Sequence, residues 1–189
     1  MNKYLVLVIL LSGFLLQACK TNLDAETYSK YQTLGNDISN QAQATLLANV
    51  GKAIQSGGPE FAVEFCNLEA SDIIDSLNRL HHATIARVSA NNRNPENALQ
   101  SDTDKELWQV FENHALGDTV IQDANHIFYY KRINTAMPAC LKCHGEPGSD
   151  INAATIEKLD RLYPADLATG YHLNDFRGMW KIEFVMEKE

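Results

Sequence analysis

The sequence feature that most restricts the structure of this 189-residue chain is the segment Cys140-Leu141-Lys142-Cys143-His144. Two cysteines three residues apart face the same side of a helical turn, and the following histidine projects its ring from that turn. This spacing lets two thiols bind the vinyl groups of one porphyrin while an imidazole ligates its iron. The pattern occurs once, so the sequence predicts one covalent haem c, attached through Cys140 and Cys143, with His144 as an axial ligand.

Two other readings of the cysteine pair are weaker. A thioredoxin-type dithiol also uses Cys-x-x-Cys, but it is expected at the start of a helix in a βαβ context, which the surrounding sequence lacks. A structural zinc site needs four ligands, and no second Cys or His pair at metal-binding spacing is present in the sequence. Haem attachment therefore remains the preferred interpretation.

The N-terminus has the pattern of an export signal. Lys3 precedes an apolar run of about 13 residues, too short to span a bilayer comfortably but suited to the core of a signal peptide. The run ends in Leu16-Gln17-Ala18-Cys19, which predicts a lipoprotein signal peptide over residues 1–18 and lipidation of Cys19. Gln17 is an uncommon residue there, and cleavage to a soluble secreted form is the alternative.

If Cys19 is lipidated, residues 19–23 form an anchor and short tether, and the protein is expected in the bacterial periplasm. Lys20, not Asp, follows the cysteine, so an outer-membrane location is favoured. The net charge of −8 disfavours nucleic acid as a partner but does not choose among protein partners. The expected partner, from the functions considered below, is a redox or signalling protein. Of the four cysteines, three would remain after lipidation, and an odd number does not suit a simple disulfide framework.

Helical periodicity dominates the first part of the mature chain. Apolar residues recur at helical spacing from Asp24 to Gln55 and again from Pro59 to about Leu80. The segment Ser56-Gly57-Gly58-Pro59 ends one helix and begins the next. Cys66 falls on the apolar stripe of the second helix, so its thiol is expected to point inward.

The later part of the chain alternates short helices and strands. Near the C-terminus, Trp180, Ile182, Phe184 and Met186 alternate with other residues at the period of a half-buried strand. In chain order, the expected elements are a strand at Thr84–Ser89, a helix at about Asp104–His114 capped by Asp102 or Thr103, a hairpin of Thr119–Gln122 and His126–Ile133, a helix at Ile151–Leu162 and the last strand. The order indicates one α+β domain over residues 24–189. Long N-terminal helices pack on an antiparallel sheet, and the haem-binding loop precedes the last strand.

The residues alone leave the second axial ligand of the iron open. An open coordination site is one possibility, and Cys66 by itself could equally be a buried, inert thiol. The candidate ligands are Met137, Met179, Met186, His81, His82, His114, His126, His172 and Cys66.

Several short segments, taken in order, carry a resemblance to a known family. They are Gly57-Gly58-Pro59-Glu60, Phe65-Cys66-Asn67, Arg93-Asn94-Pro95-Glu96-Asn97-Ala98, Tyr129-Tyr130-Lys131, the haem motif with Gly145, Tyr163-Pro164-Ala165-Asp166, Gly170-Tyr171 and Arg177-Gly178. Over roughly residues 24–187 the chain resembles a family of small mono-haem c-type proteins with a PAS-like fold. That family was long catalogued as a domain of unknown function and also serves as an extracytoplasmic sensor module.

The resemblance implies a PAS-like fold and an iron bound by His144 and, opposite it, Cys66, with Met186 as the fallback ligand. A thiolate stabilises ferric iron, so the expected function is low-potential, single-electron transfer. The alternative is a redox or gas sensor in which displacement of Cys66 is the switch, although no output domain follows Glu189. A six-coordinate iron leaves no site for a substrate, so an enzymatic role is not expected.

Overall fold

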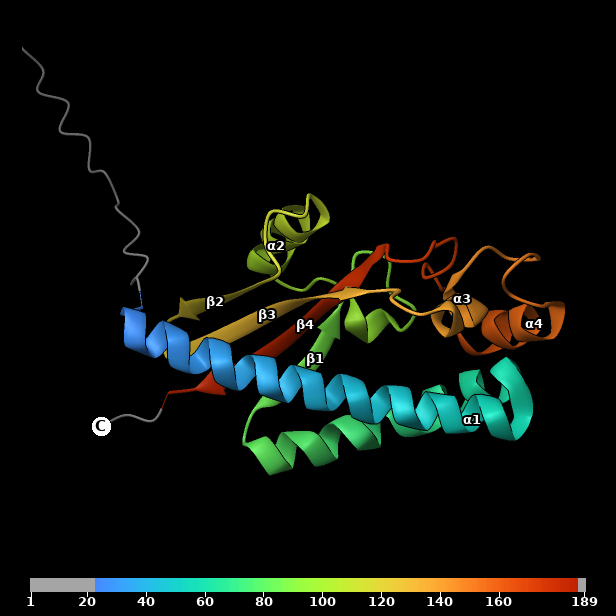
Figure 1. Ribbon diagram of the computed structural model, residues 1–189, viewed down its shortest axis with the longest axis horizontal. Helices are drawn as coiled ribbons and strands as arrows, with labels where there is room; N and C mark the ends of the chain where they lie inside the picture. Colours follow the sequence, from blue (N-terminus) through green and yellow to red (C-terminus); the bar gives the residue numbers. More distant parts are fainter. Residues whose placement is uncertain (1–22, 187–189) are drawn as a thin grey trace, which may run out of the picture.

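A long helical hairpin begins the computed structural model, which describes residues 23–186. Helix α1, Ala25–His81, is capped by Asp24, whose side chain accepts a hydrogen bond from the Thr27 amide at 2.8 Å. Its path breaks at Gly57 and Gly58, and Gly58 has a φ of 78°, which a residue with a side chain rarely adopts. The helix therefore folds back on itself at the expected place, and the two predicted helices are confirmed as its two arms (Figure 1).

Four antiparallel strands form one sheet in the order β1-β4-β3-β2. The strands are β1 (Thr84–Val88), β2 (Asp118–Asp123), β3 (His126–Asn134) and β4 (Phe176–Val185). The predicted hairpin of β2 and β3 is confirmed. Strand β4 begins earlier than its side-chain alternation indicates, because Phe176 and Gly178 pair with β3 across an irregularity at Ile133 and Asn134. The α+β, PAS-like architecture is as expected.

Helix α2, Asp102–Glu112, lies on the opposite face of the sheet from α1. The predicted cap, Asp102 or Thr103, is wrong. Ser101 caps the helix: its hydroxyl accepts from the Asp104 amide at 3.0 Å, and the Asp104 carboxylate accepts from the Ser101 amide at 3.1 Å. The remaining helices are the 3-10 turn η1 (Pro95–Asn97), α3 (Pro138–His144) and α4 (Ala153–Leu162).

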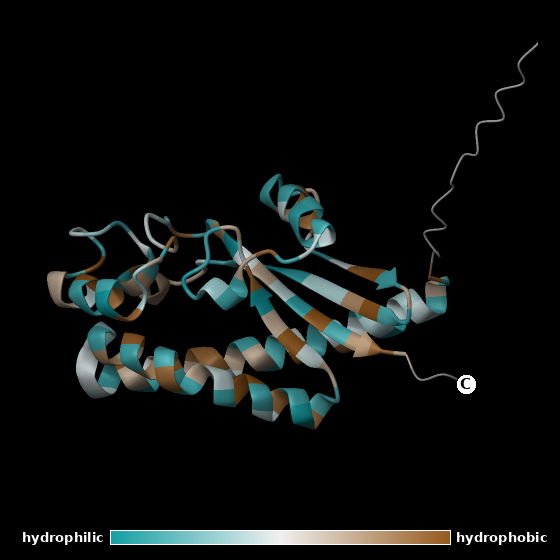
Figure 2. Ribbon diagram, turned by 180° about the vertical axis from the view of Figure 1, so that it is seen from behind, coloured by the Kyte–Doolittle hydropathy of each residue, from teal (hydrophilic) through white to brown (hydrophobic). Residues whose placement is uncertain are grey.

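The main core lies between α1 and the sheet and takes apolar residues from both. Figure 2, in which the ribbon is coloured by hydropathy, shows hydrophobic positions on the strands and on the arms of α1. Its fully buried members include Ile38 and Ala42 of α1 and Ile182 of β4. Close packing depends on Gly35, since a Cβ there would stand 2.2 Å from the Tyr129 ring. The predicted apolar stripe ends short of Leu80, which is 61% exposed.

Helices α3 and α4 pack together at the broken end of the helical hairpin, away from the main core (Figure 1). Val63 of α1 forms a small apolar cluster there with Ile151 and with Leu159 of α4. Between residues 23 and 186, no helix has both the length and the apolarity needed to cross a membrane. The predicted signal peptide over residues 1–18, and Cys19, lie outside the described residues.

Candidate functional site

The Cys-x-x-Cys-His segment forms helix α3, in the connection between β3 and β4. Pro138 occupies its first turn, and the thiols of Cys140 and Cys143 are unpaired and half-buried. The helix ends at Gly145, where a Cβ would stand 2.7 Å from the Leu141 carbonyl oxygen. The glycine therefore lets the chain turn sharply away directly after His144.

His144 is held by the loop that precedes β4. Its Nδ1 lies 2.7 Å from the Ala168 carbonyl oxygen and donates to it, because that oxygen can only accept. The amide of Tyr171 donates to the His144 carbonyl at 2.9 Å, and the amide of Gly170 donates to that of Gly145 at the same distance. With its proton on Nδ1, the ring keeps its Nε2 lone pair available for a metal.

The environment of His144 also favours the neutral imidazole. Burial is the main reason that its pKa lies well below the usual value, and the positive charges of Arg93 and Arg177 lower the pKa further. A neutral ring is the form that ligates a metal.

Cys66 lies on the arm of α1 that faces α3. Val63, one turn earlier, belongs to the cluster against which Cys143 packs, and residues three apart share a helix face. Burial raises the pKa of the Cys66 thiol, while the charges of Arg87 and Arg93 lower it. Burial likewise raises the pKa of Cys143 to about 11, and a neighbouring Cys66 charge adds to the rise. The structure thus brings Cys66 to the same neighbourhood as Cys143 and His144.

Met186 lies at the other end of the sheet from His144. Arg177, near the start of β4, approaches His144, whereas Met186 follows the end of that strand and packs on the main core. Nine residues of extended chain separate Arg177 from Met186, a span of about 30 Å. The structure does not bring Met186 to the motif.

Most of the other candidate ligands lie on elements other than α3. Met179 is fully buried beneath α2, and His126 pairs with Glu183 across the sheet. His81 ends α1, His82 follows it, and His172 is exposed beside Asp175. Met137 is the exposed N-cap residue of α3, and His114 lies just beyond α2.

Arg93 joins three segments that are far apart in the sequence. Its Nε forms an ion pair with Asp166 at 2.9 Å, and its Nη2 donates to the carbonyl oxygens of Cys143 and Ala168. Both side chains of the ion pair are mostly buried, so the ion pair fixes the position of the Arg93 guanidinium. Sequence reasoning assigned Arg93 and Asp166 no role, although both stand in segments that carried the family resemblance.

Arg177 also approaches the Nδ1 edge of the His144 ring. Its guanidinium donates to the Ser89 hydroxyl and to the Asn91 carbonyl, both at 3.0 Å. Its Nε stands 3.4 Å from Nδ1 of His144, a packing contact of two donors because Nδ1 already donates to Ala168. Arg177 was another residue to which sequence reasoning assigned no role.

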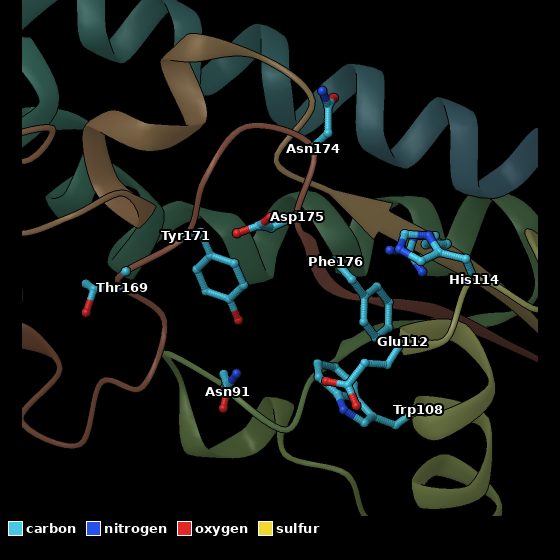
Figure 3. A pocket seen from close by; sticks show the side chains of 11 residues that line it. Asn91, Trp108, Glu112, His114, Thr169, Tyr171, Asn174, Asp175 and Phe176 are labelled. Carbon is cyan, nitrogen blue, oxygen red and sulfur yellow. The ribbon is translucent and has the colours of Figure 1, made fainter.

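A pocket of about 380 Å³ lies behind this part of the site, between α2 and residues 169–176 (Figure 3). Tyr171 lines the pocket, as Figure 3 shows, and its ring also meets the His144 ring edge-on, with 6.4 Å between the ring centres. The Tyr171 hydroxyl is buried and has no hydrogen-bond partner among the described residues. None of Cys66, Cys140 and Cys143 lines this pocket.

Comparisons with known proteins agree on one relationship. A family model described as Tll0287-like matches residues 20–184. The crystal structure of the cyanobacterial heme-protein Tll0287 is similar with a TM-score of 0.61 at 22% sequence identity, covering 88% of this chain and 99% of that chain. At that identity the structural likeness supports the shared fold. No curated protein matches the chain.

Proposed function

The chain belongs to the Tll0287-like family, and from this premise we propose that it binds one covalent haem c and transfers single electrons at low potential. A member of similar fold is described as a heme-protein. The proposal adds to that description the covalent linkage, the ligands and the role in electron transfer.

The observation that carries the proposal is the convergence of three thiols and one imidazole at the broken end of the helical hairpin. Cys140 and Cys143 share a face of α3, and Nε2 of His144 is left free by the bond to Ala168. These groups suit two thioether bonds and one axial ligand to the same porphyrin. The haem would supply a one-electron couple, and the chain's own residues hold it, orient it and shield it from water.

Cys66 is the residue we propose as the second axial ligand. It reaches this neighbourhood from α1, on a different part of the chain from His144, whereas Met186 lies about 30 Å from Arg177 along the sheet. An anionic sulfur favours the more positive state of a metal, so we expect a potential below that of a His/Met-ligated haem.

Sensing is the second candidate function, because of where Cys66 lies in α1. The residue sits on the arm that follows the break at Gly57 and Gly58, and the same helix packs along the sheet. Release of Cys66 from the iron would remove one attachment of this arm to the site and could shift its position, a two-state change that redox state or a gas ligand could bias. We propose no enzymatic role for the protein, whether Cys66 is bound to the iron or released from it.

Export and lipidation are part of the proposal. We propose that residues 1–18 are removed, that Cys19 carries the lipid and that the protein faces the periplasm, with the outer membrane favoured. Removal of residues 1–18, with their single Lys, would leave a mature net charge of −9. A membrane-anchored protein of that charge would meet its redox or signalling partner, a protein, at the membrane surface.

The test of haem attachment compares the three cysteines of the site. The protein is produced in a host with haem c maturation machinery, then treated with acid acetone and run on a denaturing gel. Wild type and Cys66→Ala should keep their haem through both steps, whereas Cys140→Ala and Cys143→Ala should lose most or all of it. Complete extraction of haem from the wild type would contradict covalent attachment.

A further inference from the structure

Three arginines surround the motif, but only one of them is neutralised by a carboxylate. Within residues 23–186, Arg93 pairs with Asp166, Arg177 donates to neutral oxygens, and Arg87 makes neither an ion pair nor a hydrogen bond. The guanidinium carbon of Arg87 lies over the Trp180 ring, 6.0 Å from the ring centre. Its five N–H donors are therefore unused by the protein.

The strand places Arg87 beside the site. Residues two apart on β1 share a face, so Arg87 points the same way as Ile85, toward α1. Ser89, about 7 Å further along the strand, accepts from Arg177, which contacts His144. Arg87 thus lies on the α1 side of the sheet, at the end of β1 nearest the motif.

The surroundings of Arg87 leave its guanidinium free to bind an anion. The side chain is exposed to solvent, so its unused donors are accessible to a ligand. The Cys66 and Tyr163 side chains are close enough for their charges to act on it, which places the guanidinium near the proposed sulfur ligand. An anion bound there would meet a positive charge that no carboxylate of the described residues neutralises.

The proposed cofactor supplies such an anion. A ferric porphyrin carries one surplus positive charge, which a thiolate ligand cancels, so its two propionate carboxylates remain as uncompensated anions. The planar guanidinium fork is the side chain best suited to bind a carboxylate through two parallel hydrogen bonds. We propose that Arg87, with its unused donors on the α1 face of the sheet beside the motif, binds a propionate carboxylate of the haem. This inference rests on the proposed function.

The test is resonance Raman spectroscopy of the haem-loaded protein, which detects the bending vibration of the propionates. Loss of a hydrogen bond to the carboxylate lowers the frequency of that band. Arg87→Gln should therefore shift the band down and, because a positive charge near the iron is lost, also lower the midpoint potential. Arg87→Lys should keep most of the potential but still shift the band, because an ammonium retains the charge without the fork.

Arg79→Gln is the matched control. It removes the same charge from an exposed position on α1, thirteen residues or about 20 Å beyond Cys66, and should leave the band unchanged. An unchanged band in Arg87→Gln and Arg87→Lys, with haem attached, overturns the inference and leaves the proposed function standing. A change confined to the iron–sulfur signal also overturns it, since Arg87 would then act on Cys66. Absence of covalent haem from the wild type would overturn the proposed function itself.

Discussion

Asp104 shows how a single residue joins a helix cap to the sheet. It is fully buried, and its carboxylate accepts from the Tyr130 hydroxyl at 2.7 Å and from Lys181 at 2.9 Å, in addition to the backbone of the α2 cap. Burial raises the pKa of Asp104, but these hydrogen bonds outweigh it, so the pKa lies below its ordinary value.

We expect Asp104→Asn to reduce the free energy of unfolding by about 2–4 kcal/mol at pH 7, because Lys181 and the cap lose a charged acceptor. A pKa that is depressed in the folded state stabilises the fold above the ordinary aspartate pKa of about 4 and ceases to do so as the pH falls through the folded value. Urea unfolding of both proteins should thus show a difference that narrows in acid. A constant difference from pH 7 to pH 3 would contradict this account.

At Cys66, we expect replacement by alanine to change the spectrum and the potential while leaving the haem attached. Loss of an anionic ligand removes a preference for the oxidised iron, so the midpoint potential should rise, and added imidazole or CO should bind more readily. Redox titration and optical spectra, oxidised and reduced, measure both effects. A ferric spectrum and potential equal to those of wild type would mean that the second ligand is another residue.

At the scale of elements, the break in α1 determines where Cys66 can lie. Gly58 combines a φ of 78° with an extended ψ of −179°, a region almost restricted to glycine, and a Cβ there would stand 2.6 Å from the Glu60 carboxylate. Gly51 lies in regular helix on the first arm of α1, and a Cβ there would meet no atom within 4 Å. The two glycines therefore serve different purposes in one helix.

We expect Gly58→Ala to lower the free energy of unfolding by about 1–3 kcal/mol, because the side chain cannot adopt this conformation without strain. Gly51→Ala is the control and should stabilise the protein by about 0.5–1 kcal/mol through helix propensity. Thermal or urea unfolding of the two variants compares them directly. Equal effects of the two changes would contradict a backbone role for Gly58.

At the scale of the whole molecule, the site stands at one end of the sheet and takes residues from α1, the segment after β1, α3 and the loop before β4 (Figure 1). The two long arms of α1 connect this end of the sheet to the main core, because residues of α1 belong to both apolar clusters. Helix α1 begins at Ala25, so an anchor at Cys19 would leave only a few residues of the sequence between the membrane and that helix.

We expect Cys19→Ser to release the protein from the membrane fraction or to leave its precursor uncleaved, because a lipoprotein signal requires a cysteine sulfur to carry the lipid. Fractionation and the mass of the mature N-terminus measure the outcome. Haem attachment in the exported variant should be unchanged, which separates anchoring from cofactor binding. A wild-type protein found soluble, with its N-terminus elsewhere, would favour ordinary signal cleavage.

Much of the fold follows from local patterns that the chain carries by itself. Helical spacing and the Gly57–Gly58 pair predict the two arms of α1, and period-two alternation predicts the last strand. The cysteine and histidine spacing predicts the turn of helix that forms α3. In each case the interacting residues are near neighbours, so their relation can be read along the sequence.

The contacts between residues far apart in the sequence could be found only in the folded protein. The ion pair of Arg93 with Asp166 spans 73 residues, and the bond of His144 to Ala168 uses a backbone oxygen that carries no sequence signal. Leu80 is exposed for the same kind of reason, since periodicity shows which face is apolar but not where the partner surface ends. The motif thus identifies the chemistry, while the packing of α1, β1 and the last loop around α3 determines which other side chains reach it.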